Sequence, residues 1–165
     1  MPEYRRKRIK TVDKNQYQLL KSIEVHSGLT GLIAEKTVVE HDGGLDQFDA
    51  MWISSLCDST AKGKPDIELV DMSSRLRTID DVLDVTTKPI ILDGDTGGLI
   101  EHFVYNVRTL ERMGVSAVII EDKTGLKKEF SVWHGSRTDT GFYRKISAQK
   151  SELVKMFFVQ KKFMI

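Results

Sequence analysis

PIILDGDTGG, residues 89–98, joins an unbroken apolar run to two aspartates that stand one residue apart among glycines. The apolar run predicts a short strand covered on both faces, which would place Asp93 and Asp95 at its carboxyl end. Gly94, Gly97 and Gly98 would let the backbone approach a ligand closely. Taken alone, the two aspartates fit a solvated turn between a strand and a helix. The alternative is a shared partner for both carboxylates, and the neighbouring segments bear on that choice.

Apolar and polar segments alternate along the chain on both sides of this motif. Strands are predicted at residues 22–27, 48–54, 88–93 and 115–122. Helices are predicted at residues 28–40, 73–86 and 100–113, and residues 58–66 are predicted to form a polar loop. Strands that alternate with helices indicate βα units and a parallel sheet. Such folds bind their ligands at the carboxyl ends of the strands.

Glu121 ends the fourth predicted strand and follows Asp93 by 28 residues. This step is close to the ~30 residues of one βαβ unit, so a right-handed crossover would set the two acids side by side at one rim. Oxygen ligands without a nearby histidine or cysteine suit a hard cation, Mg²⁺ before Ca²⁺ or Zn²⁺, that keeps some of its waters. The sequence therefore predicts a magnesium site formed by Asp93, Asp95 and Glu121.

Composition bounds the class of protein. With 165 residues, of which 40% are apolar and 30% charged, the chain is long enough for one globular domain with a core. Cys57 is the only cysteine, and neither a signal pattern nor an apolar run of about 20 residues is present. We therefore expect a reducing, cytoplasmic location and no membrane partner.

The net charge of +1 hides an asymmetry along the chain. Residues 1–122 contain 15 Lys and Arg against 21 Asp and Glu, whereas residues 123–165 contain 10 against 3. A basic arm can bind nucleic acid, but the aromatic and lysine residues here follow no motif of that kind, so we expect no nucleic-acid partner. The basic segment at residues 4–10 is interpreted as part of a solvated helix or linker.

Four segments at predicted strand ends resemble one known family. FDAMWISSL (48–56), PIILDGDTGG (89–98), LERMGVSAVIIEDK (110–123) and GLKK (125–128) look like the phosphoenolpyruvate mutase branch of the isocitrate lyase superfamily. The resemblance covers roughly residues 20–128. It implies an α/β fold, the first half of a (β/α)8 TIM barrel with about four βα units, followed by an irregular tail. In that family the reaction interconverts phosphoenolpyruvate and phosphonopyruvate, a step of phosphonate biosynthesis.

The resemblance implies Mg²⁺ as the cofactor and assigns acids to it. Asp93 matches the direct ligand, while Asp66, Asp95 and Glu121 match acids that hold the metal largely through water. Asp66 is also grouped with the catalytic residues. The chemistry needs such a site, because an enolate oxygen must be stabilised while the phosphoryl group leaves oxygen and bonds to carbon.

Substrate contacts are implied in the same way. Ser54, Ser55 and Leu56 match the loop that holds the pyruvyl carboxylate and carbonyl, although the family usually has glycine where Ser55 stands. Lys123 and Lys127 match catalytic cations that steady the metaphosphate-like group. The lyase branch carries a Cys-Gly-His motif after its lysines, and this chain has TGLKKEFSV there.

Two positions depart from the mutases. Glu129 stands where they carry an asparagine that contacts the migrating phosphoryl group, and a carboxylate would repel that group. Their phosphate-binding arginine closely follows a DFMI-like stretch, and no arginine of that kind follows FMI at residues 163–165. We therefore expect this chain to be inactive as it stands.

Residues 129–144 can be explained as coding sequence read out of register. An allowed codon choice beginning GAA TTC AGT GTT TGG, read with one nucleotide skipped, gives NSVFGTEVEQTQDSIE, which starts with the missing asparagine. We therefore expect a frameshift near residue 128, which sequencing the gene would test. The chain is divided accordingly into an N-terminal helix or linker (1–20), a partial barrel (21–128) and a divergent basic tail (129–165).

The expected parent activity is the Mg²⁺-dependent mutase acting on a small-molecule substrate. A phosphonopyruvate hydrolase, a carbon–carbon lyase of the same superfamily, and a non-catalytic fragment or interaction domain are left open, as is homo-oligomerisation. Half a barrel would leave the last predicted strand without a neighbour. We therefore expect Val118 and Ile120 to stay partly exposed.

Overall fold

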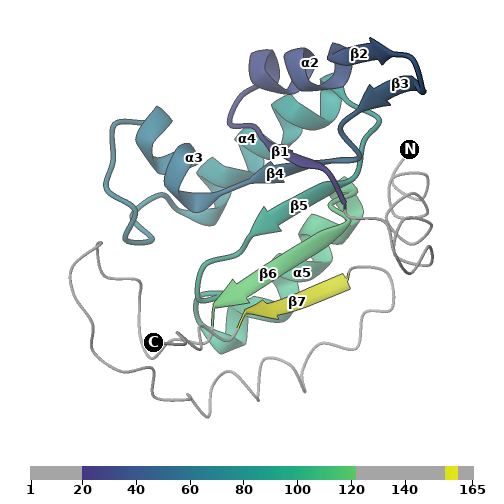
Figure 1. Cartoon of the computed structure of the whole chain (residues 1–165). Coiled ribbons are helices and arrows are strands. Elements are labelled where there is room, and N and C mark those ends of the chain that lie inside the picture. Colours follow the sequence, from purple (N-terminus) through teal and green to yellow (C-terminus); the bar gives the residue numbers. More distant parts are fainter. Residues whose placement is uncertain (1–19, 122–154, 160–165) are drawn as a thin grey trace, which may run out of the picture.

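The computed structural model describes residues 20–121 and 155–159. Its centre is a five-stranded sheet in which every pairing is parallel and the strands follow one another in chain order (Figure 1). The strands are β1 (Ser22–Glu24), β4 (Ala50–Ile53), β5 (Ile90–Asp93), β6 (Ala117–Glu121) and β7 (Lys155–Val159). A sheet wound in sequence order, without the reversal of a doubly wound fold, has the arrangement of a barrel wall.

Helices connect these strands, and three of the four described helices begin at a residue whose side chain caps them. They are α2 (Gly28–Lys36), α3 (Ser55–Ala61), α4 (Met72–Val85) and α5 (Ile100–Met113). Ser27, Ser54 and Asp71 cap the first three through side-chain oxygens that accept a hydrogen bond from a backbone N–H of the first turn. Gly114 ends α5 in the left-handed conformation, at φ 105°. None of the helices in the described ranges is long and apolar enough to cross a membrane.

Alternate residues of each strand face opposite sides of the sheet. On one side, strand residues such as Met51, Leu92 and Ile120 join residues of α2, α4 and α5 in one buried cluster. Figure 1 shows α4 and α5 on the same side of the sheet. On the other side, Trp52 and Ile119 belong to a second, smaller cluster. The helices therefore cover one face, as they do in a barrel, and the second face carries the strand-end side chains of the candidate site.

Two segments differ from their predicted structure. α2 ends at Lys36, and β2 (Val38–His41) then pairs antiparallel with β3 (Gly44–Gln47) around residues 42–43. The β-branched residues at positions 37–39 favour extended backbone, and Asp-Gly at 42–43 is a strong hairpin signal, so the predicted helix to residue 40 was too long. The predicted loop at residues 58–66 begins inside α3, because Ser54 caps a helix that runs to Ala61.

The expected exposure of the fourth predicted strand was wrong. Val118 and Ile120 are each only 1% exposed. Both belong to the helix-side cluster together with Phe103 and Val107 of α5. In addition, β7 pairs with β6 along its full length, so this side of β6 is not an open edge. β7 lies in the range for which an irregular tail was predicted.

A polar cluster lies at the amino-terminal end of the sheet, opposite the carboxyl ends of the strands. Glu35 of α2 accepts hydrogen bonds from the hydroxyls of Thr86 (2.6 Å) and Thr87 (2.9 Å), and the buried Lys88 donates to Gln47 of β3 (2.9 Å). Burial acts to raise the pKa of Glu35, but these hydrogen bonds and the charge of Lys88 outweigh it and hold the pKa below its ordinary value. The cluster ties α2 and the hairpin to the segment that enters β5.

Candidate active site

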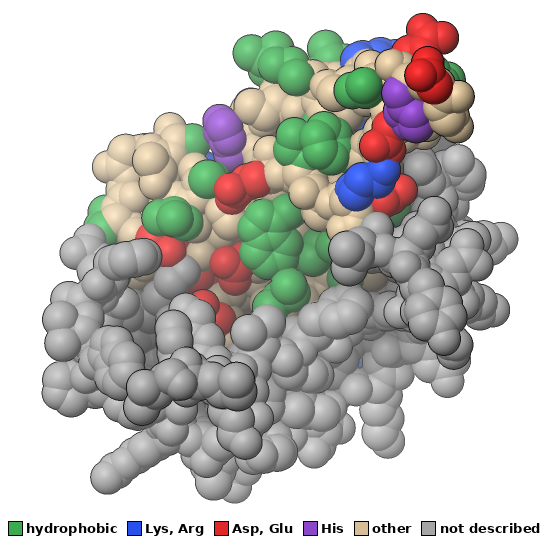
Figure 2. All heavy atoms as spheres, viewed as in Figure 1, with side chains coloured by type: hydrophobic (Ala, Val, Ile, Leu, Met, Phe, Trp, Pro, Cys, Tyr) green, Lys and Arg blue, Asp and Glu red, His purple; other side chains and the backbone are tan. Residues whose placement is uncertain are grey.

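Side chains that end the parallel strands lie on one face of the sheet, at its carboxyl edge. Glu24 ends β1, Ser54 follows β4, Asp93 ends β5 and Glu121 ends β6. Because side chains alternate along a strand and paired residues share a face, these four lie on the face that carries Trp52, opposite the helices. Figure 2 shows acidic side chains beside apolar groups on this face. The sheet thus brings the strand-end residues to one rim.

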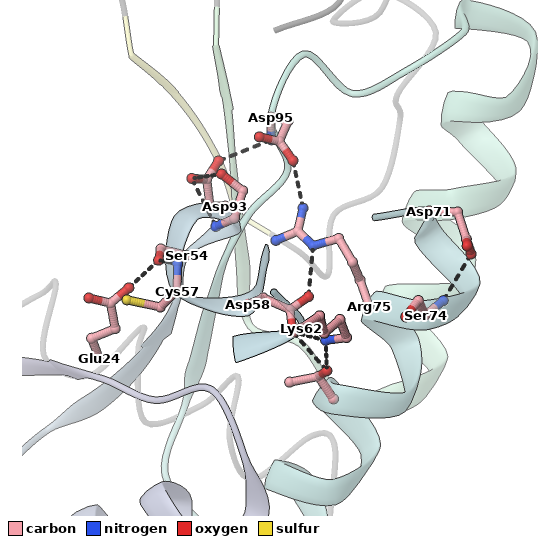
Figure 3. A network of polar contacts seen from close by, with 12 residues as sticks. Glu24, Ser54, Cys57, Asp58, Lys62, Asp71, Ser74, Arg75, Asp93 and Asp95 are labelled. Carbon is pink, nitrogen blue, oxygen red and sulfur yellow. Dashed lines mark hydrogen bonds and ion pairs between the residues drawn. The ribbon is translucent and has the colours of Figure 1, made fainter. Parts of the chain in front are cut away.

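Asp93 is held at the rim by three donors. Its Oδ2 accepts hydrogen bonds from the hydroxyl (3.1 Å) and the backbone N–H (3.4 Å) of Ser55 (Figure 3). Its Oδ1 accepts a third from the backbone N–H of Asp95 (3.0 Å). Hydrogen bonds to a carboxylate are among the stronger ones and fix its orientation. A residue expected in the substrate loop therefore directly contacts the residue expected to bind the metal.

Asp95 turns its carboxylate toward a buried arginine that sequence reasoning did not identify. Arg75 of α4 donates from Nη1 to Oδ2 of Asp95 at 2.9 Å, and the two side chains are only 5% and 8% exposed. Asp95 has a left-handed backbone (φ 51°), which is uncommon for a residue other than glycine. Its carbonyl oxygen accepts a hydrogen bond from the N–H of Glu121 (2.7 Å). Asp95 is therefore the link between the acids of the rim and Arg75.

A second buried carboxylate faces Arg75 from α3. The Nε of Arg75 lies 3.7 Å from Oδ2 of Asp58, which is 1% exposed. Oδ1 of Asp58 accepts a hydrogen bond from the Thr78 hydroxyl (2.8 Å) and pairs with Lys62, whose Nζ also donates to Thr78 (2.7 Å). Figure 3 shows this network reaching from Lys62 to Asp95. Two carboxylates and two cations therefore balance one another beneath the rim.

Ser54 contacts two neighbours at the end of β1 and the start of α3. Its hydroxyl donates to the Glu24 carboxylate and accepts a hydrogen bond from the backbone N–H of Cys57 (3.0 Å). Burial and, after it, the hydrogen bond with Glu24 raise the pKa of the Cys57 thiol, which makes the thiol a weak nucleophile at neutral pH. Leu56, the third residue predicted for this loop, is 50% exposed. Glu24 places a carboxylate beside the predicted substrate loop.

The loop between α3 and α4 docks on the glycine-rich loop after β5. The Thr96 hydroxyl donates to the Glu68 carboxylate (2.9 Å), and Glu68 itself has a left-handed φ of 61°. Asp66 lies in the same loop and is partly buried. The remaining predicted positions lie outside the described residues: Lys123, Lys127 and Glu129.

The predicted metal ligands are joined through the backbone more than through their carboxylates. Within residues 20–121 and 155–159, no three Asp, Glu, His or Cys side chains come together as a metal-binding group. Asp95 contacts Asp93 and Glu121 by main-chain hydrogen bonds, while its carboxylate pairs with Arg75. The ligand set Asp93, Asp95 and Glu121 therefore stays a prediction. Within this set, Asp93 is partly exposed and is held by uncharged donors.

Gly94 is required by packing rather than by a ligand. A Cβ at this position would lie 2.6 Å from Cδ1 of Ile120, 2.8 Å from Cγ1 of Val118 and 3.1 Å from the carbonyl oxygen of Ile119. The loop after β5 can therefore lie against β6 only without a side chain here. Gly98 differs, because nothing lies within 4 Å of its position and its φ of 67° is what favours glycine.

Three residues of this region were missed by sequence reasoning, although each left a signal. Arg75 lies on the buried face of α4 with Ile79 and Val82, and a charge on an apolar stripe indicates a buried partner. Glu24 is an acid inside the strand predicted at residues 22–27; because β1 already ends at Glu24, the predicted bound three residues later kept it out of the set of strand-end acids. Asp58 was assigned to a loop, whereas it lies in the first turn of α3, where an acidic residue is favoured.

Comparison with known proteins gives consistent matches. The model of a family described as phosphoenolpyruvate phosphomutase matches residues 13–159. The phosphoenolpyruvate phosphomutase of Tetrahymena pyriformis is 33% identical over 102 residues, which cover 61% of this chain and 31% of that protein. The crystal structure of the phosphoenolpyruvate phosphomutase from Streptomyces platensis subsp. rosaceus matches with a TM-score of 0.74 at 23% identity, over 92% of this chain and 52% of that one. A phosphonopyruvate hydrolase, solved in complex with oxalate and Mg²⁺, matches with a TM-score of 0.70 at 22% identity, over 96% and 52%.

These matches bear on the fold and on the extent of the likeness. The chain spans about a third of the curated relative and about half of the two solved structures. The predicted fold class is confirmed, because the parallel α/β sheet matches about half of a TIM-barrel-like relative. The family match also continues past residue 128, where the motif resemblance ended, and includes β7. Since it takes in most of the residues, the chain belongs to the phosphoenolpyruvate phosphomutase family.

Proposed function

We propose that this chain carries one part of the active site of a Mg²⁺-dependent enzyme that interconverts phosphoenolpyruvate and phosphonopyruvate. The observation that carries the proposal is the contact between Ser55 and Asp93. It joins the expected substrate loop to the expected metal ligand at the carboxyl edge of a parallel sheet, where such folds bind their ligands. The family membership supports the reaction type.

The donor set at the rim fits Mg²⁺. The acids that end β1, β5 and β6 offer oxygen atoms, and Mg²⁺ keeps several waters, so one or two protein carboxylates suffice for it. Asp93 would be the direct ligand, because Ser55 and the Asp95 N–H, which orient its carboxylate, are uncharged donors that leave its negative charge in place. The hydrolase that shares this fold was solved with Mg²⁺ and oxalate, a small dicarboxylate.

Roles for the remaining residues are proposed from the family resemblance. Ser54 and Ser55 would offer hydroxyl and backbone donors to the pyruvyl carboxylate and carbonyl. The hydroxyl and the N–H of Ser55 both donate to Asp93 here, so Ser55 must release or share one of these donors to contact a substrate. The Ser54 hydroxyl donates to Glu24 here, so it must turn away from that carboxylate to donate to a substrate. Mg²⁺, when bound, would supply electrostatic stabilisation of the enolate oxygen. Lys123 and Lys127 are proposed to steady the phosphoryl group as it moves.

Phosphonopyruvate hydrolysis is the second candidate. The observation that favours it is the hydrolase structure, which matches 96% of this chain. The two reactions differ in the acceptor of the phosphoryl group, which is the enolate oxygen in the mutase and water in the hydrolase. Because the chain spans about half of these relatives, we propose that it binds Mg²⁺ by itself but that turnover requires a complete barrel.

Cation binding by the 165-residue chain is tested first. Mg²⁺ should raise the melting temperature of the unaltered chain, because a ligand that binds only the folded state stabilises it. Asp93→Ala should abolish the rise, whereas Asp84→Ala, at an exposed acid on α4, should retain it. Equal melting temperatures with and without Mg²⁺ in the unaltered chain would exclude the proposed site.

Turnover is tested separately by phosphorus NMR of phosphonopyruvate with Mg²⁺. A mutase produces the phosphoenolpyruvate signal, and a hydrolase produces inorganic phosphate. We expect neither product from the 165-residue chain. Conversion by a purified, monomeric chain would contradict the requirement for a complete barrel.

A further inference from the structure

Arg75 reaches from α4 to the underside of the rim. Its guanidinium donates from Nη1 to Asp95 at 2.9 Å and is almost fully buried. On its other side, Nε lies 3.7 Å from Oδ2 of Asp58, and within the described residues neither of these two atoms has a hydrogen-bond partner. The hydrogen bond makes Asp95 the main partner of Arg75, and Asp58 adds charge at a longer distance.

Asp95 transmits this contact to the rim. Its N–H donates to Oδ1 of Asp93 (3.0 Å), and its carbonyl oxygen accepts from the N–H of Glu121 (2.7 Å). One residue therefore contacts the proposed metal ligand, the acid that ends the next strand, and Arg75. A displacement of Asp95 would lengthen or break its hydrogen bonds to all three.

The backbone of Asp95 needs such support. Its left-handed φ of 51° is a sparsely populated conformation for a side chain other than glycine. Conformations of this kind persist when the surrounding structure over-determines them. The ion pair with Arg75 and the two main-chain hydrogen bonds supply that constraint at Asp95.

Arg75 is itself anchored from below. Asp58 is 1% exposed and is fixed by the Thr78 hydroxyl and by Lys62. A guanidinium between two buried carboxylates presents its donors in a rigid, planar arrangement. Its position is therefore set by α3 and α4, and Asp95 is set by it in turn.

We propose that Arg75 is a positioning residue that fixes Asp95, and through it Asp93, in the geometry that binds the divalent cation. The identity of the cation rests on the proposed function, whereas the contacts that join Arg75, Asp95 and Asp93 do not depend on it. A guanidinium also repels a nearby cation, so electrostatics alone would make its removal strengthen Mg²⁺ binding. Positioning predicts the opposite sign, because outer partners of metal ligands are worth about 10- to 100-fold in affinity.

The test compares three variants of the full 165-residue chain. Arg75→Met removes the charge and keeps most of the stem, and Arg75→Lys keeps the charge but loses the planar fork. Arg77→Met is the matched control, because Arg77 lies two residues along the same helix and is exposed. Hydrogen exchange without metal is followed at the N–H of Asp95 and of Glu121, with the Val25 N–H, bonded to Trp52, as the internal reference. Calorimetry then gives the Mg²⁺ affinity of each variant.

Positioning predicts several-fold faster exchange at Asp95 and Glu121 in Arg75→Met, relative to the Val25 reference, and unchanged exchange in Arg77→Met. Mg²⁺ affinity should fall at least about tenfold in Arg75→Met and less in Arg75→Lys. Unchanged exchange at both sites, or Mg²⁺ binding as tight as in the unaltered chain, overturns the proposal. If the unaltered chain binds no Mg²⁺, the proposed cofactor fails, and the exchange rates still decide the role of Arg75. Should Arg75→Met not fold, Arg75→Lys and Asp58→Asn are held to the same two criteria.

Discussion

Gly94→Ala tests how closely the loop after β5 packs against β6. The added Cβ would lie 2.6 Å from Cδ1 of Ile120 and 2.8 Å from Cγ1 of Val118, both in side chains that are 1% exposed. Real Cβ atoms do not approach other atoms so closely, so one strand or the loop must shift. The carbonyl oxygen of Ile119, at 3.1 Å, limits how far the loop can turn away.

The magnitude follows from two opposing effects. Overpacking a buried site costs about 1–3 kcal/mol. Replacing glycine reduces the entropy of the unfolded chain and returns about 0.4–1 kcal/mol. We therefore expect a net loss of about 1–2 kcal/mol in the free energy of unfolding. For a chain of this size each kcal/mol lowers the melting temperature by about 2–4 °C.

A double-mutant cycle separates the clash from a general loss of packing. Ile120→Val deletes the Cδ1 atom nearest to the new methyl group and should cost about 0.5–1.5 kcal/mol by itself. Combined with Gly94→Ala it should cost less than the sum of the two, by about 0.5–1 kcal/mol. The control is Ile79→Val in α4, an isoleucine of equal burial that is not among the atoms nearest Gly94, for which we expect additivity.

Urea unfolding followed by circular dichroism at 222 nm measures the unaltered chain, the three single variants and the two double variants, provided that the transitions are two-state. Additive effects of Gly94→Ala and Ile120→Val would refute the close approach. So would a Gly94→Ala chain as stable as the unaltered one.

Three further predictions concern single contacts. Ser55→Ala removes the hydroxyl donor to Asp93 and should lower the free energy of unfolding by about 1.5–3 kcal/mol in urea titrations, whereas Leu56→Ala, at an exposed neighbour, should change it little. The pKa of Glu35 lies below its ordinary 4.5, so the stability that its charge contributes is present above about pH 4.5 and is lost as the pH falls through the lowered pKa. Glu35→Gln should remove this acid-sensitive part of the free energy of unfolding. Parallel curves of stability against pH for the variant and the unaltered chain would contradict this. Glu24→Gln should lower the pKa of Cys57 and speed its alkylation by iodoacetamide at pH 8, and an unchanged rate would show that burial alone raises that pKa.

Much of the fold was predictable because its signals are local. β4, β5 and β6 are short, mostly apolar runs, and α4 and α5 show apolar residues at helical spacing. Parallel pairing followed from the alternation of strands and helices, which leaves few other topologies. The errors at residues 37–40 and 58–61 lie where two local signals compete over a few residues. There β-branching and a capping serine decided the structure.

The site was predictable as far as strand ends define it. The acids at the ends of β5 and β6 could be placed at one rim from chain order alone, because parallel strands end at the same edge. The pairing of Asp95 with Arg75 could not, since the two residues are 20 positions apart on different elements. A buried arginine can pair with any carboxylate within its reach. The partner is decided by the rotation of the helix and the length of the side chain, and residue spacing in the sequence predicts neither.

The different partners of the two aspartates explain why one of them suits a cation better. Arg75 meets Asp95 as a full positive charge, so the field of that carboxylate is largely cancelled within a few ångströms. Asp93 is held by the Ser55 hydroxyl and by backbone N–H groups, which orient its oxygens and leave its charge in place. A divalent ion at the proposed site would therefore gain more from Asp93 than from Asp95. Asp95 would act on the ion through its N–H to Asp93, and Arg75 would act through Asp95. The more deeply buried of these residues would thus act on the ion more indirectly.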